Sequence, residues 1–271
     1  MTLEVNGAGA TDPERNFPQS GSPASPTFNM LTTRHTREDL RTAACTAAVL
    51  PVGAVEQHGR HLPFETDILI AQAMASRLAE RLSAYLLPPL GISSSIEHRL
   101  AKGTVFIRSE TLALVIRDIA ACLRDSGFTR LILANGHGGN WVLKPTVRQL
   151  NRDWSDFRTI LVSPDPPAPV AREVLEHPVG DVHGGEAETS IMLHLYPDCV
   201  RPVAPSGEAA FPLQGFLDYF DITDLTAAGH WGWPESATAE KGRKLFEAMV
   251  ASALELIAAI EEQARAIAAR K

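Results

Sequence analysis

The sequence predicts an α/β protein, a three-layer αβα sandwich with a mainly parallel sheet. Short apolar runs that stop at Gly or Pro alternate with longer segments of helical periodicity along most of the 271 residues. This alternation is typical of parallel strands whose sheet is covered by helices on both faces. Ligands bind such sheets at the carboxyl ends of the strands. Polar residues that directly follow strands are therefore the first candidates for function.

The predicted elements follow from these runs in chain order. The predicted strands are residues 46–52, 85–87, 131–134 and 159–162, and the predicted helices are residues 68–82, 109–126, a helix from about Trp141, 186–195 and 240–269. Ser109 is a predicted N-cap of its helix, and Cys122 lies on the apolar stripe of the same helix as a predicted small core residue. Residues 1–30 are rich in Gly, Pro and Ser and predict a disordered tail, which leaves 31–271 as a single catalytic domain.

Composition excludes several classes of function. The formal net charge is −7 and the chain has no long Lys/Arg run, which argues against nucleic acid as a partner. It has no apolar run long enough to cross a bilayer, and no basic segment followed by an apolar stretch at its start. Its three cysteines are far apart and predict neither a disulfide framework nor a metal site. We therefore expect a cytoplasmic protein that does not bind membranes.

The first polar cluster follows the strand predicted at 46–52. Glu56 and His58 are two residues apart, so in extended backbone their side chains share a face. Asp67 returns after a turn marked by Gly59 and Pro63. Carboxylate and imidazole without thiolate suit Zn, Mn or Fe(II). A polar loop with Asp67 as a helix N-cap explains the same residues, and this cluster alone does not separate the two interpretations.

The second cluster, NGHGGN at 135–140, follows the strand predicted at 131–134. Its three glycines allow a sharp turn around His137 and a close approach of a ligand to the backbone. A tight strand-to-helix turn with an incidental histidine is one alternative. An anion cradle before a helix is another, although the loop lacks the lysine and the spacing of a P-loop.

The third cluster, DVHGGEAETS at 181–190, places His183 and two acids at a helix start. Glu186 and Glu188 are two residues apart and cannot share a helix face, so only one of them should reach the same point as His183. Alternatively, both acids favour the helix N-terminus through its dipole. That alternative explains Glu188 well and His183 poorly.

Together, the segments PVGAVEQHGRHLPFETD, NGHGGN and HGGEAETS resemble the creatininase family of metal-dependent hydrolases, over about residues 40–262. The family includes creatinine amidohydrolase, a formamide hydrolase and the mycofactocin precursor peptidase. The resemblance implies a creatininase-like fold, a homohexamer and two divalent ions per chain (Zn, Mn or Fe). It implies His183 as the acid/base residue and Asp67 as the bridge between the ions, and the metal ligands would be Glu56, His58, Asp67, His137 and Glu186. Further candidates, for supporting the ligands or binding substrate, are Asn135, Asn140, Glu188, Glu97, His98 and Trp231.

One departure from the family pattern bears on the substrate. Creatinine amidohydrolase has Tyr-Glu where this chain has Gly138-Gly139, and that Glu binds metal. We expect Glu186 to replace it, which argues against creatinine as the substrate. The expected reaction is hydrolysis of a C–N bond in a small amide, lactam or formamide by a metal-bound hydroxide. The alternatives are a peptidase that trims a modified precursor peptide, a hydrolase of a cyclic ketone C–C bond, and a non-catalytic metal-dependent binding protein.

Overall fold

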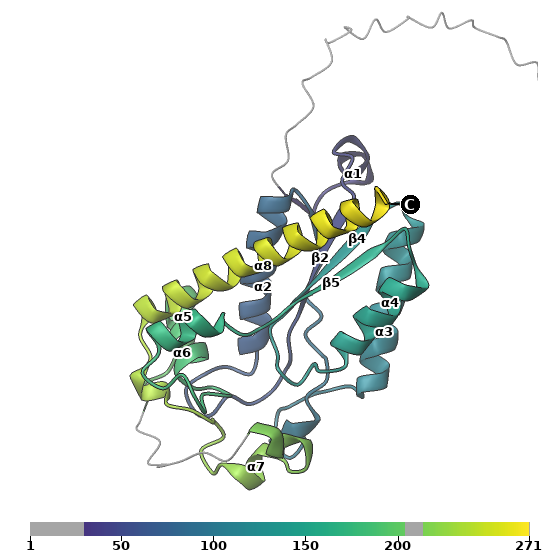
Figure 1. Ribbon diagram of the computed structural model, residues 1–271. Helices are drawn as coiled ribbons and strands as arrows, with labels where there is room; N and C mark the ends of the chain where they lie inside the picture. Colours follow the sequence, from purple (N-terminus) through teal and green to yellow (C-terminus); the bar gives the residue numbers. More distant parts are fainter. Residues whose placement is uncertain (1–29, 204–213, 271) are drawn as a thin grey trace, which may run out of the picture.

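The protein is built around a single five-stranded parallel sheet (Figure 1). The computed structural model describes residues 30–203 and 214–270, so the predicted tail lies outside the described residues except for Met30. The strand order is β1-β3-β2-β4-β5, and the strands are β1 (Leu31–Thr32), β2 (Ala47–Val52), β3 (Tyr85–Leu86), β4 (Arg130–Asn135) and β5 (Arg158–Val162).

The two central strands, β2 and β4, carry the site. They pair in parallel from Ala47 opposite Arg130 to Val52 opposite Asn135, so both strands end at the same level. All six residues of β2 are buried, as expected for a central strand covered on both faces. The loops that follow Val52 and Asn135 therefore start side by side at one edge of the sheet.

Helices cover both faces of the sheet and complete the predicted three-layer sandwich. Helices α2 (Thr66–Leu82), α5 (Ala168–Val174), α6 (Glu186–Leu195) and α8 (Ala239–Ala268) pack on the face that carries Val49 and Ile132. Helices α3 (Ser109–Asp125) and α4 (Leu143–Asp153) pack on the face that carries Leu50 and Leu133. In Figure 1, α8 runs across one side of the strands and α3 and α4 lie on the other. The predicted fold class is confirmed.

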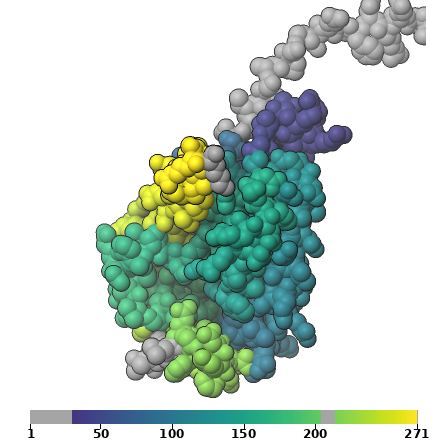
Figure 2. Space-filling model, turned by 45° about the vertical axis from the view of Figure 1, so that its right-hand side comes forward, coloured from purple at the N-terminus to yellow at the C-terminus, as the bar shows by residue number. Residues whose placement is uncertain are grey.

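Shorter elements surround the sandwich. They are α1 (Arg37–Thr42), α7 (Ile222–Leu225) and the 3₁₀ helices η1 (Ile96–His98), η2 (Pro197–Cys199), η3 (Gln214–Asp218) and η4 (Pro234–Ser236). The light green segment that contains α7 forms the lower edge of the face seen in Figure 2. Within the described residues, no helix has both the length and the apolarity needed to cross a membrane.

The predicted strands and helices agree with the observed ones to within about two residues at each end, whereas the short β1, α1, α5 and α7 were not predicted. Two local predictions are wrong. Ser109 is the first helical residue of α3 and not its cap, because Arg108 holds the N-cap position without a side-chain hydrogen bond. Cys122 is exposed and not a core residue, because the buried stripe of α3 runs through Leu112, Ile116, Ala120 and Leu123.

Candidate metal centre

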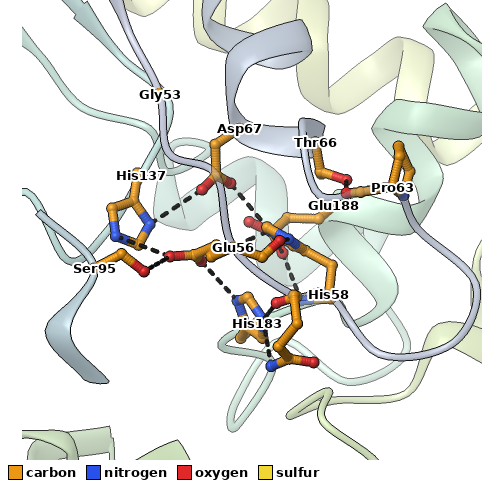
Figure 3. Close-up of polar contacts among 12 residues, drawn as sticks. Gly53, Glu56, His58, Pro63, Thr66, Asp67, Ser95, His137, His183 and Glu188 are labelled. Atoms are coloured by element: carbon orange, nitrogen blue, oxygen red, sulfur yellow. Dashed lines mark hydrogen bonds and ion pairs between the residues drawn. The ribbon is translucent and has the colours of Figure 1, made fainter. Parts of the chain in front are cut away.

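A cluster of buried acids and histidines lies where β2 and β4 end (Figure 3). Glu56 and His58 lie on the segment after β2, and Asp67 lies in the first turn of α2. His137 follows β4, and His183 precedes α6. All five side chains are buried. The three sequence clusters, far apart in the chain, therefore meet at one point.

Two glycines let the strand ends approach the first turn of α2. A Cβ added at Gly53 would lie 2.5 Å from the backbone nitrogen of Ile68, and one added at Gly136 would overlap the carbonyl oxygen of Asp67. Neither position can carry a side chain while α2 stays in place. The absence of these side chains is what brings Asp67 to the ends of β2 and β4.

Asp67 lies between two histidines. Its Oδ1 atom is 3.1 Å from His58 Nε2, and its Oδ2 atom is 3.2 Å from His137 Nδ1. The Oε2 atom of Glu56 lies 3.2 Å from His137 Nε2 and accepts a hydrogen bond from the Ser95 hydroxyl at 2.5 Å. One carboxylate thus faces two imidazoles with different oxygens, an arrangement suited to bridging two cations.

Hydrogen bonds to backbone carbonyls fix which ring nitrogen of His58 and of His183 faces the centre. His58 donates from Nδ1 to the carbonyl of Glu56 at 3.1 Å, and His183 donates from Nε2 to the carbonyl of Gln57 at 2.6 Å. The opposite nitrogen of each ring therefore points inward, and His183 Nδ1 lies 3.5 Å from Glu56 Oε1. Metal-binding and acid/base histidines are commonly held in this way by a backbone carbonyl.

Glu188 and not Glu186 turns toward the centre. The Oε2 atom of Glu188 lies 4.0 Å from His58 Nε2 and accepts from the backbone N–H of Gly184 at 2.5 Å. The fully buried Glu186 points elsewhere: it accepts from two backbone N–H groups at 2.9 Å, and Lys241 Nζ lies 2.6 Å away. Residues two apart on a helix point in nearly opposite directions, so only one of the two can face His183. The geometry does not support the predicted ligand role of Glu186.

Three overlapping groups of side chains could each hold a cation. Their ligand atoms lie within 4.8 Å of one another, and the groups are Glu56/Asp67/His137, His58/His183/Glu188 and Glu56/His98/His183. Glu56 Oε1, Asp67 Oδ2 and His137 Nε2 are buried and form no hydrogen bond within the described part of the chain. Buried polar atoms are normally satisfied, so these atoms fit a site for divalent ions. Mixed carboxylate and imidazole ligands suit Zn or Mn.

The charges of the cluster are strongly coupled. Burial raises the pKa of Glu56 to about 8 and that of Glu188 to about 7. Burial would lower the pKa of His58, but the neighbouring carboxylates of Asp67, Glu188 and Glu56 together outweigh it and raise that pKa to about 10. Burial and the positive charge of His58 hold the pKa of His183 well below its usual range. Protons and cations therefore compete for the acids, as metal sites require.

The two predicted asparagines hold the NGHGGN loop together. Asn135 donates to the carbonyl of His137 at 2.8 Å, and its Oδ1 accepts from the Asn140 amide at 3.0 Å. Asn140 in turn accepts from the backbone N–H of Ser94 at 3.2 Å. Both side chains thus fix the backbone around His137 and do not face the centre of the cluster.

The remaining predicted residues lie around the cluster. His98 Nε2 is 3.5 Å from Glu56 Oε1, and Glu97 Oε1 is 3.5 Å from His137 Nε2. Trp231 is fully buried and pairs with His183 through the backbone, donating to its carbonyl at 2.6 Å. Trp231 therefore positions His183 without lining the cleft.

Two further residues were not predicted from the sequence. Gln57 donates from its amide to the Gly229 carbonyl at 2.6 Å and lies 3.1 Å from His98 Nδ1. It stands between two predicted ligands, but in extended backbone its side chain was expected to point away from them. Ser95, which donates to Glu56, follows two other serines and gives no signal that distinguishes it.

A cleft of about 520 Å³ opens over the cluster. Glu56, His137, His183 and Glu188 lie at its base, whereas His58 and Asp67 are not among the residues that line it. The remaining lining residues, which include apolar ones, are Ile96, Glu97, His98, Gly138, Gly139, Trp141, Val182, Gln214, Gly215, Leu217 and Asp218. A substrate in this cleft can reach His183 and the outer side of the acid cluster.

The chain belongs to the creatininase family. The family model for creatininase, creatinine amidohydrolase, matches residues 31–257. This confirms the resemblance found in the three sequence segments. The protein is thus a metal-dependent hydrolase of this family.

Two relatives are named for different substrates. A mycofactocin precursor peptide peptidase from Mycobacterium ulcerans is 34% identical over 226 residues, which cover 78% of this chain and 84% of the relative. A creatinine amidohydrolase from Pseudomonas putida is 32% identical over 221 residues, which cover 74% of this chain and 85% of the relative. The family relationship alone does not choose between a peptide and a small cyclic amide.

Solved structures agree with the fold and with metal binding. A putative creatinine amidohydrolase from Bacteroides fragilis has a TM-score of 0.68 at 26% identity and covers 87% of this chain and 97% of its own. A mutant creatininase of the Zn-Zn type has a TM-score of 0.66 at 28% identity, with coverages of 86% and 98%. A creatininase with Mn has a TM-score of 0.64 at 26% identity, with the same coverages.

Proposed function

We propose that the protein uses two divalent ions to hydrolyse a C–N bond in a peptide or peptide-like substrate. The observation that carries the proposal is the meeting of the three sequence clusters in one buried acid–histidine centre at the base of an open cleft. The similarity to a precursor peptide peptidase shifts the expected substrate from a small amide to a peptide. The proposal retains the metal-dependent hydrolysis of a C–N bond that the sequence predicts and changes only the expected substrate.

The ligand assignment follows the contacts of Asp67. The first ion would be held by Glu56, Asp67 and His137, whose unsatisfied atoms converge. The second would be held by His58, Asp67 and Glu188. When bound, two such ions lower the pKa of a water molecule and polarise the carbonyl of the scissile bond. Zn and Mn both fit these ligands.

His183 is the proposed proton-transfer residue. It lines the cleft, whereas His58 does not, and its Nδ1 faces the acid cluster. Because Nε2 donates to the carbonyl of Gln57, Nδ1 carries the lone pair that accepts a proton from water. The same atom can pass this proton to the departing nitrogen of the substrate. Backbone pairing with Trp231 holds the ring in this orientation.

The shape of the cleft favours an extended substrate. A Cβ added at Gly138 would meet no atom within 4 Å, so the backbone of the NGHGGN loop borders open space. Ile96 and Trp141 line the cleft and are 51% and 62% exposed. Exposed apolar side chains beside a buried reactive centre can bind the side chains of a peptide that lies across the opening.

A small cyclic amide is the second candidate. A volume of about 520 Å³ lies within the usual range of about 300–1,000 Å³ for small-molecule sites. In that case the substrate would lie wholly inside the cleft and make little use of the exposed rim. The length of the best substrate therefore separates the two candidates.

The test is a substrate comparison with the metal-loaded protein. Peptides of two to ten residues, with and without a blocked terminus, would be compared with creatinine, simple lactams and formamides. We expect kcat/KM to be highest for peptides and to fall when Trp141 is replaced by Ala. Turnover of lactams or creatinine with no turnover of any peptide would contradict the peptide proposal. Absence of bound metal in a folded, active preparation would contradict the mechanism.

A further inference from the structure

Glu97 faces the metal centre from a segment outside the three sequence clusters. It lies on η1, and its side chain is 11% exposed. Its Oε1 atom is 3.5 Å from Nε2 of His137, a nitrogen that forms no hydrogen bond within the described residues. Glu56 Oε2 lies 3.2 Å from the same nitrogen. Two carboxylates thus approach one buried imidazole nitrogen.

The loop after β4 leaves room for this carboxylate at Gly139. A Cβ added there would overlap Oε1 of Glu97 and Nε2 of His137. The φ angle of Gly139 is not positive, so its backbone does not require glycine. What Gly139 provides is space, and Glu97 fills it. A side chain at 139 and the carboxylate of Glu97 exclude each other.

The position of η1 is fixed from outside. Arg99 makes a two-pronged ion pair with Asp221, with Arg99 Nε 3.0 Å from Asp221 Oδ1 and Arg99 Nη2 3.0 Å from Oδ2. Asp221 is the N-cap of α7. On the inner side, His98 lies 3.5 Å from Glu56. Glu97 therefore directly precedes a buried residue and an anchored one, and these two contacts hold η1 where the Glu97 carboxylate faces the centre.

We propose that Glu97 is an additional metal ligand, which joins His137 on the first ion and occupies the space that Gly139 leaves free. The inference rests on the proposed metal-dependent function. With Glu97, four carboxylates face the centre, the others being Glu56, Asp67 and Glu188. Their charge balances that of two divalent ions when the histidines are neutral.

The test compares metal binding and does not depend on activity. Glu97→Gln keeps the size of the side chain and removes its charge. Metal content after gel filtration and competition with a chelator should show one ion bound about 10- to 100-fold more weakly or more, since even indirect supports of ligands cost that much. The second ion should be retained. Glu110→Gln, in the exposed first turn of α3, is the matched control and should leave both affinities unchanged.

A rescue experiment separates a ligand from a merely structural residue. Glu97→Asp keeps a carboxylate on η1 and should bind the first ion more tightly than Glu97→Gln does. Gly139→Ala should weaken the same ion, because its Cβ overlaps both Oε1 of Glu97 and Nε2 of His137. Co²⁺-loaded protein gives a second readout, because its visible absorption should change in Glu97→Gln and return toward the wild type in Glu97→Asp.

The outcomes are distinct. Wild-type metal content and affinity in Glu97→Gln would overturn the inference and leave the proposed function standing. A wild-type protein that binds no divalent ion would overturn the proposed function itself. If Glu97→Gln does not fold, Glu97→Ala decides: weakened binding of one ion supports the ligand role of Glu97, and wild-type affinity for both ions overturns it.

Discussion

Exchanging the carboxylates of Glu186 and Glu188 for amides should separate the metal centre from the structure that supports it. Glu188→Gln removes an anion that faces His58, so we expect loss of one bound ion together with activity. Glu186→Gln lies on the opposite side of α6 and should keep both ions. The same substitution should therefore reduce metal binding at position 188 and protein stability at position 186.

The magnitude for Glu186→Gln follows from its contacts. The change weakens a charge-assisted contact of 2.6 Å to Lys241, and hydrogen bonds to charged groups contribute about 1.5–3 kcal/mol. Lys241 is 17% exposed and keeps Glu176 and the Ser236 carbonyl, each at 2.7 Å. The cost should therefore stay below the roughly 3–5 kcal/mol of breaking a fully buried pair. We expect a loss of about 2 kcal/mol in the free energy of unfolding, which lowers Tm by about 4–8 °C in a protein of this size.

The assay combines thermal unfolding with metal analysis of the same samples. Lys241→Met is the matched control: it removes the pair from the other side and should also lower Tm without loss of metal. Loss of metal in Glu186→Gln, with full metal in Glu188→Gln, would refute the assignment and return Glu186 to the ligands.

Four further predictions follow from the site. His183→Ala should keep both ions and lower kcat by roughly 10²- to 10⁴-fold, whereas His137→Ala should lose metal. Gly136→Ala should destabilise the protein by about 1–3 kcal/mol because its Cβ overlaps the first turn of α2, whereas Gly138→Ala should be tolerated. Exhaustive chelation should remove about two ions per chain and abolish activity, and returning Zn²⁺ or Mn²⁺ should restore it. The family resemblance predicts a homohexamer, and light scattering that gives a monomer mass at micromolar concentration would reject it.

The fold could be predicted because its signals are local. The strands at β2 and β4 are continuous apolar runs, and the helices have clear periodicity, so alternation alone indicated a parallel sheet. The elements that were missed, such as β1 with two residues and α7 with four, are too short to show a period. The predicted cap at Ser109 failed for a different reason. Its hydroxyl lies 3.1 Å from that of Ser94, a tertiary contact that the sequence does not reveal.

The sequence was enough to bring together the candidates that follow strands, but not to orient those that lie on turns between elements. Glu56 and His137 come directly after β2 and β4, so the sheet rule was enough to bring them together. Glu97, predicted only as a candidate for supporting the ligands or binding substrate, and Ser95, which was not predicted, lie in the segment before α3, whose path depends on packing. Which of Glu186 and Glu188 faces the cluster depends on how α6 is rotated about its axis. The sequence showed only that one of the two must point away from the cluster.

The rotation of α6 about its own axis is set by contacts at its first turn and not by a contact of Glu188 with metal. Asp181 accepts from the backbone N–H groups of Glu186 and Ala187 at 2.6 and 2.8 Å, and Lys241 of α8 holds the Glu186 side chain. With Glu186 fixed on that side, Glu188 must face the opposite one, where His58 lies. The contacts of Glu186 therefore determine that Glu188 is the carboxylate that faces the cluster. This arrangement also explains why Glu186 is fully buried although it is not near the centre: its ion pair joins the N-terminal turn of α6 to that of α8. A variant that breaks the Glu186–Lys241 pair should first lower the free energy of unfolding. Its metal affinity should fall only if α6 rotates and carries Glu188 away from His58.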